Sequence, residues 1–275
     1  RVALQLIEAG AGVNHASAHG RTQPRAFYHA AMNGATALMA ACQCGHDRVA
    51  LQLIEAGAKV NQTEEDGWTA MMFACQDGHD QCALQLIEAG AKLDVANNKG
   101  FTALILACEK GHDSDPHDSE YGHDPCALQL IGAGANLEKQ TAEGFTALML
   151  ACQSGYDRVA IHLIKAGANL EKQTARGFTA LMLACEYGHL SGNDRCVRVL
   201  LEKGAKLEKQ NNNLSTAMEI ACEANNLVCV QHLSSFRANR IFMRGGSDTA
   251  EQAASSHHDK ELLDWLIQSR EWDPL

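Results

Sequence analysis

Gly-Phe-Thr-Ala-Leu, the sequence of residues 144–148, returns unchanged at residues 177–181. Variants of this segment recur along the chain, each with a marker threonine at its centre: Thr36, Thr69, Thr102, Thr146, Thr179, Thr216 and Thr249. Successive markers are 33, 33, 44, 33, 37 and 33 residues apart, so the period is 33 with insertions of 11 and 4 residues. Such a period predicts a stacked array, in which each unit buries its apolar face only against a neighbour.

Residues 66–98 show what one unit contains. Thr69 follows a turn and is a good N-cap for a helix over about residues 70–76. Gly78 is placed to end that helix in a left-handed conformation. A second helix is expected over about residues 80–88, followed by an extended stretch that leads to Gly100. The unit is therefore predicted to be a helix, a turn, a second helix and a long hairpin.

This unit resembles the ankyrin repeat, whose pattern is Asp-x-x-Gly-x-Thr-Pro-Leu-His-x-Ala-Ala-x-x-Gly-His, an apolar helix and Gly-Ala-x-x-Asn. The resemblance covers essentially the whole chain and implies an all-α ankyrin-repeat solenoid of helix-turn-helix units joined by β-hairpin-like loops. Two departures recur: alanine replaces the proline, and Met or Ile replaces the first histidine. Asn225 stands where other units have the helix-ending glycine, while Leu214 and Arg237 replace two further glycines.

The resemblance implies one array over residues 1–275. We expect a truncated repeat with a lengthened hairpin at 1–33, full repeats at 34–66, 67–99, 100–143, 144–176 and 177–213, a degenerate repeat at 214–246 and a capping repeat at 247–275. Residues 1–10 are identical to residues 48–57. The chain thus starts in the middle of a unit, so we expect it to be a fragment of a longer one, with a targeting segment able to lie upstream.

Charge and cysteine usage restrict the possible partners. A net charge of −10 argues against a nucleic-acid or membrane-surface role, since both polyanions would be repelled. No apolar stretch reaches the ~18 residues of a membrane span. Ten of the eleven cysteines fall in two columns of the period, and Val49 and Val159 share the second column. Such columns indicate small apolar packing positions with reduced thiols, so we expect an intracellular, cytoplasmic protein.

Three features resemble chemical sites but have simpler interpretations. Cys-x-x-x-His recurs, as at Cys75 and His79, but one pair per repeat cannot supply the four converging ligands of a zinc site. Residues 113–123 form an acidic, histidine-rich insertion that is more typical of a solvated loop than of a cation site. The insertion at 23–33 is either a segment that grips a partner or a loose excursion. We therefore expect no metal, no cofactor and no catalysis.

The residue before the marker threonine is the main candidate for function. It is aromatic in four successive units, as Trp68, Phe101, Phe145 and Phe178. In ankyrin-like units this position lies on the concave side, where aromatic side chains act as anchors in protein interfaces. The alternative is that the rings lie along the hairpins and pack against the neighbouring turn. Polar residues expected at the rim follow the marker by seven or eight positions: Gln76, Asp77, Glu109, Lys110, Gln153, Glu186 and Tyr187.

These observations favour a non-catalytic module or scaffold that binds another protein through its concave face. Two alternatives remain open at this stage. The array could be a permanent structural subunit of a large multiprotein assembly, or the regulatory region of a longer enzyme. Neither nucleic-acid binding nor membrane insertion is expected.

Overall fold

The computed structural model describes residues 13–15, 34–109, 124–187, 193–238, 250 and 260–269. The chain divides into two compact units, unit 1 (Arg1–Ala142) and unit 2 (Glu143–Leu275). Within the described residues there are thirteen helices and no strand, and the one isolated β-bridge joins Thr63 to Thr69. The expected all-α fold is confirmed. None of the described helices is long and apolar enough to cross a membrane.

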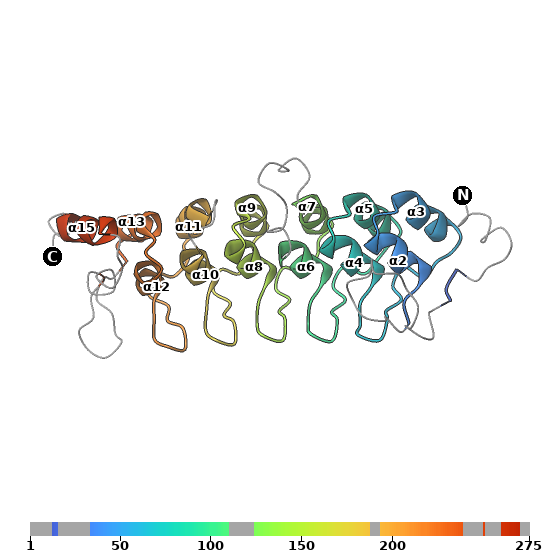
Figure 1. The fold of residues 1–275 in the computed structure, drawn as a ribbon, viewed down its shortest axis with the longest axis horizontal. Coiled ribbons are helices and arrows are strands. Elements are labelled where there is room, and N and C mark those ends of the chain that lie inside the picture. The colour runs from blue at the N-terminus through green and yellow to red at the C-terminus, as the bar shows by residue number, and fades with distance from the viewer. Residues whose placement is uncertain are drawn as a thin grey trace. The chain divides into compact units, whose positions relative to one another are not determined.

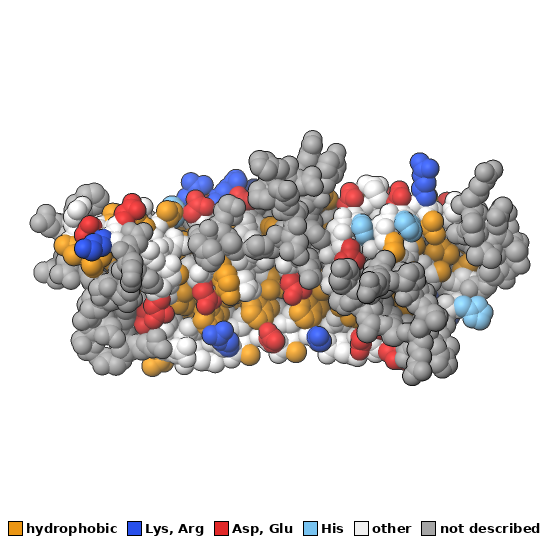
Figure 2. Space-filling model, in the orientation of Figure 1, with side chains coloured by type: hydrophobic (Ala, Val, Ile, Leu, Met, Phe, Trp, Pro, Cys, Tyr) orange, Lys and Arg blue, Asp and Glu red, His pale blue; other side chains and the backbone are white. Residues whose placement is uncertain are grey.

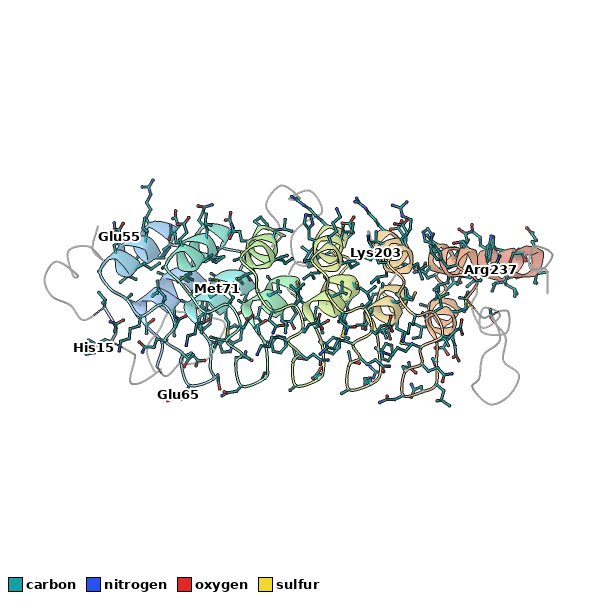
Figure 3. The ribbon with its side chains drawn as sticks, turned by 180° about the vertical axis from the view of Figure 1, so that it is seen from behind. His15, Glu55, Glu65, Met71, Lys203 and Arg237 are labelled. Carbon is teal, nitrogen blue, oxygen red and sulfur yellow. The ribbon has the colours of Figure 1, made fainter. Side chains whose placement is uncertain are left out.

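Unit 1 contains three pairs of helices, and Figure 1 shows them in two rows. The inner helices are α2 (Ala37–Gln43), α4 (Ala70–Gln76) and α6 (Ala103–Glu109), which pack on one another in that order. The outer helices are α3 (Asp47–Glu55), α5 (Asp80–Glu88) and α7 (Asp124–Gly132), which form the second row. Met71 lies among these helices and Glu65 at the tip of a hairpin (Figure 3). Each helix pair is therefore the predicted helix-turn-helix unit.

Unit 2 repeats the arrangement. Its inner helices are α8 (Ala147–Gln153), α10 (Ala180–Glu186) and α12 (Ala217–Glu223), and each contacts the next in the row. Its outer helices α9 (Asp157–Lys165), α11 (Asn193–Glu202) and α13 (Leu227–Ser235) do the same. A last helix, α15 (Glu261–Gln268), lies where the capping repeat is expected. The exact repeat borders stay a prediction.

The marker threonines cap the inner helices, as predicted. The Thr69 hydroxyl accepts a hydrogen bond from the backbone N–H of Met72 at 3.2 Å, and Thr179 accepts one from Met182 at 3.3 Å. In α2 and α8 the methionine also reaches back: the Met149 thioether sulfur lies 3.4 Å from the N–H of Thr146. The methionine that replaces the family's histidine therefore still completes a cap at some units.

Adjacent hairpins are tied together by main-chain hydrogen bonds. In unit 1, the Asn98 N–H donates to the carbonyl of Asp66 at 2.9 Å; in unit 2, the Asn212 N–H donates to that of Arg176 at 3.1 Å. Lys209 forms an ion pair with Glu171 at 3.7 Å between two hairpins of unit 2. These bonds satisfy backbone groups that have no strand ladder to join, and they hold each hairpin in register with the next.

Three non-glycine residues that stand at glycine positions of the repeat pattern have a left-handed backbone. Asn225, Leu214 and Arg237 are the non-glycine residues with positive φ among the described residues, at 52°, 65° and 64°. All three replace a glycine of the pattern. Gly177 occupies the same turn as Leu214, one repeat earlier, and a Cβ there would lie 2.7 Å from the backbone nitrogen of Asn212. Glycine is favoured in this turn because the backbone is left-handed there. At Gly177 it is also favoured because the backbone of Asn212 leaves no space for a Cβ.

The cysteine columns are packed in the core. Ten of the eleven cysteines are buried as free thiols, and Cys44 is exposed. A hydrogen bond to the Cys126 thiol and burial raise the pKa of Cys75 well above its usual value. The Cys229 thiol and burial do the same to the pKa of Cys185. A cysteine of the first column therefore contacts a cysteine of the second column in the next repeat. Comparison of positions within a single column does not predict this contact.

We expect Leu214→Gly to stabilise the protein. A left-handed leucine is strained by about 1–2 kcal/mol, and glycine removes this strain. Glycine also loses more conformational entropy on folding, which offsets part of the gain, so the free energy of unfolding should rise by about 0.5–1 kcal/mol. The matched change Gly177→Ala should lower it by about 2 kcal/mol, because its Cβ has no space. Urea unfolding followed by circular dichroism measures both, and earlier unfolding of Leu214→Gly would show that the leucine side chain makes stabilising contacts.

The thiols should differ sharply in reactivity. In the native protein iodoacetamide should modify Cys44 rapidly, whereas the buried cysteines should react only after unfolding, because they are inaccessible and Cys75 and Cys185 have a raised pKa. Mass spectrometry of tryptic peptides, with and without urea, reads out each site. Rapid native-state labelling of Cys75 or Cys185 would contradict the packing described here.

Candidate protein-interaction site

The residue before each marker threonine is fixed where the hairpin meets the inner helix. The Trp68 N–H donates to the Glu64 carboxylate at 2.9 Å, and the Trp68 carbonyl accepts from the Glu64 N–H at 3.1 Å. Phe101 is held in the same way by Asn97, at 3.0 and 2.9 Å. Because both backbone groups are bonded, the backbone that carries the aromatic side chain is held in one place.

In unit 1 the two aromatic side chains are half-buried. The Trp68 ring stacks on Phe73 of the following helix α4, with ring centroids 5.1 Å apart and an interplanar angle of 21°. One face of the indole is therefore covered by its own repeat. The alternative that the rings pack against neighbouring parts of the protein therefore holds in part at Trp68. Trp68 and Phe101 each keep some exposed surface.

Unit 2 corrects the expectation of exposed rings. Phe145 is half-buried, but Phe178 is only 6 % exposed. The Arg176 guanidinium lies over the Phe178 ring at 5.1 Å from its centroid, in cation–π geometry. Thr174 holds the Phe178 backbone as Glu64 holds Trp68, with an N–H to hydroxyl distance of 3.1 Å. The side chain that is accessible to solvent here is therefore Arg176, and not Phe178.

The expected rim residues also differ in exposure. In unit 1, Gln76 is buried at 7 % and Asp77 is exposed, while Glu109 is half-buried and Lys110 lies outside the described residues. Burial of Gln76 removes it from the accessible rim. In unit 2, three residues at the C-terminal ends of the inner helices are half-buried: Gln153, Glu186 and Tyr187. The accessible candidates are therefore fewer than the sequence predicts.

Glu186 has a distinct electrostatic environment. Partial burial raises its pKa above the usual value, the nearby Arg176 lowers it, and the Glu223 carboxylate raises it. Burial is the largest of these effects, and repulsion from a second carboxylate adds to it. None of the ion pairs within 4.0 Å between described residues includes Glu186. The carboxylate therefore lies near a cation without a direct pairing.

The sequence analysis missed Arg176 and Glu223. Glu223 is seven residues after Thr216, in the column of Gln153 and Glu186, so the period could have identified it. Arg176 lies in the hairpin three residues before its marker, and no pattern distinguishes it. Its position over Phe178 depends on three-dimensional packing.

The described residues offer no cluster of three or more His, Cys, Asp or Glu that could hold a metal ion. Of the Cys-x-x-x-His pair at 75 and 79, Cys75 is in the core and the His79 ring nitrogen lies 3.0 Å from the carbonyl oxygen of Gln43. That contact links His79 to the preceding repeat. The insertions at 23–33 and 113–123 lie outside the described residues, so their roles stay predictions.

Comparison with known proteins identifies the repeat. A sequence profile described as ankyrin repeats (3 copies) matches residues 3–94, 38–114 and 118–211. Among solved structures, the crystal structure of the human ASB11 ankyrin repeat domain is similar, with a TM-score of 0.72 and 24 % identity over 88 % of this chain and 100 % of that chain. No curated protein matches. The profile spans most of the chain, which therefore belongs to the ankyrin-repeat family.

Proposed function

We propose that this chain is a non-catalytic module that binds a partner polypeptide on the face formed by the inner-helix ends and the hairpins, which we call the inner face. Ankyrin repeats are generally protein–protein interaction modules. In unit 1 this face carries the half-buried aromatic side chains Trp68 and Phe101, and in unit 2 the corresponding face carries Phe145.

The contrast between columns supports this proposal. Columns that face neighbouring helices hold nearly the same residue in each repeat: the first-helix cysteines, such as Cys75 and Cys185, are 0 % exposed. Columns on the inner face instead differ between repeats and keep accessible surface, as at Asp77 and Tyr187. Packing between repeats therefore does not determine the identity of these residues. Variable, partly apolar surface on a rigid frame is the composition expected of an interface.

The accessible aromatic rings are the single observation that carries the proposal. A half-exposed aromatic side chain keeps apolar surface in water that a partner would cover. Phe101, whose backbone is already fixed by hydrogen bonds with Asn97, loses little conformational freedom on binding. Phe101 and Phe145 are therefore the anchors that we expect to contribute most.

Binding can be tested with peptides selected from a phage-displayed library of 12-residue sequences. We expect Phe101→Ala or Phe145→Ala to weaken the dissociation constant of selected peptides by about 10–30-fold, the loss of an anchor worth about 1.4–2 kcal/mol. Fluorescence anisotropy with labelled peptides provides the measurement.

Phe236→Ala is the matched control. Phe236 is 40 % exposed, follows the outer helix α13 and is not part of the inner face. Its loss removes the same ring from another surface and should leave the affinity unchanged. Equal weakening by all three variants, or no effect of either anchor variant while the fold persists, would remove the inner face as the binding site.

A further inference from the structure

We propose that the outer face of unit 2 binds an acidic segment of a partner protein, at a surface separate from the inner face. This surface is formed by α9 and α11, which pack side by side, and by the residues directly after each helix. It carries six exposed cationic side chains, which we call the outer basic patch: Arg158, Lys165, Arg195, Arg198, Lys203 and Lys206. The proposal does not depend on the proposed function, because it uses no residue of the inner face.

The positive charge of this surface is not a general property of the repeat. Residues 157–169 and 194–206 contain the six cations of the patch and three acidic residues. The equivalent repeat positions in unit 1, residues 47–59 and 80–92, contain three Lys or Arg and four Asp or Glu. The local charge is therefore +3 in unit 2 and −1 in unit 1, in a chain whose net charge is −10. Figure 2 shows basic side chains gathered along the outer row of helices in unit 2.

The acidic residues of the same surface neutralise only part of this charge. Arg195 forms an ion pair with Asp157 at 2.8 Å, which links α11 to α9. Arg198 lies 3.9 Å from Glu202, and both side chains are 54 % exposed, so this pair contributes little. The other four cations of the patch have no ion pair within 4.0 Å among the described residues. They are therefore accessible to the carboxylates of a partner.

Fold stability accounts for only two of these four cations. Lys165 lies in the last turn of α9 and Lys203 directly follows α11, and a cation is stabilising at the carbonyl end of a helix. Arg158 lies instead in the first turn of α9, where a positive charge meets the positive end of the helix. Lys206 lies beyond the last turn of α11, where the helix dipole has little effect. Recognition of an anionic partner explains why both positions are basic.

A polypeptide is the anionic partner that fits this surface best. Guanidinium and ammonium groups form charge-assisted hydrogen bonds with carboxylates, and complementary charge favours the encounter. Val228 of α13 occupies the repeat position of Arg158 and Arg195, is 45 % exposed, and lies on the helix next to α11. It offers apolar contact to a side chain of the partner. A nucleic acid or an anionic membrane would extend beyond the patch and meet the net negative charge of the chain.

The test uses a fluorescein-labelled 12-residue peptide in which six glutamates alternate with three leucines and three serines. Fluorescence anisotropy measures its dissociation constant for the whole chain. Binding should be at least about tenfold tighter than that of the same peptide with glutamine at the six glutamate positions, and about tenfold tighter at 0.05 M than at 0.5 M salt, because salt screens ionic contacts. The double variant Arg158→Gln/Lys206→Gln should bind the acidic peptide about five- to tenfold more weakly.

Arg48→Gln/Lys59→Gln is the matched control, because it removes exposed cations from the same two repeat positions in unit 1. This control should keep the affinity within about twofold, and circular dichroism checks that each variant is folded. Phe101→Ala and Phe145→Ala should also leave the affinity unchanged, which separates this surface from the inner face. Equal weakening by the two double variants, equal binding of the glutamate and glutamine peptides, or tighter binding of a twelve-nucleotide oligothymidylate would overturn the proposal.

Discussion

Packing of each short helix pair against the next repeat is the constraint on which the rest of the structure depends. The inner helices are only seven residues long, too short to be stable alone in water. They are held because side chains such as Leu104 and Leu148 are 1 % exposed, and burying one leucine contributes about 1.5–3 kcal/mol. Small residues are required between helices, which explains the alanine and cysteine columns. Residues outside these contacts are free to differ.

The same constraint decides what the sequence could predict. Spacing alone placed the helices, the threonine caps and the left-handed position that Asn225 occupies, because each is set within one repeat or by its column. It also showed that Leu214 and Arg237 stand at glycine positions, and the structure adds that both are left-handed. Exposure was harder to predict. Phe178 is buried under Arg176 and Gln76 is buried in α4, whereas residues in the same columns keep accessible surface. Whether a ring is covered depends on side chains that the period does not specify.

The inner face of unit 2 shows how stability and recognition divide between positions. Its helix ends carry Glu186 and Glu223, which oppose the helix dipole, while the cap at Thr179 and the hairpin bond from Phe178 to Thr174 stabilise the same repeat. A rigid frame therefore tolerates a locally unfavourable charge.

Hydrogen–deuterium exchange of the protein with and without a peptide selected from the phage-displayed library tests the central claim most directly. The account predicts slower exchange over residues 176–187 and 216–223 when the peptide is bound, with unchanged exchange in the outer helices α9 and α11. Both regions lie in unit 2, so each experiment contains its own reference. Protection confined to the outer helices, with none at the ends of α10 and α12, would contradict the account.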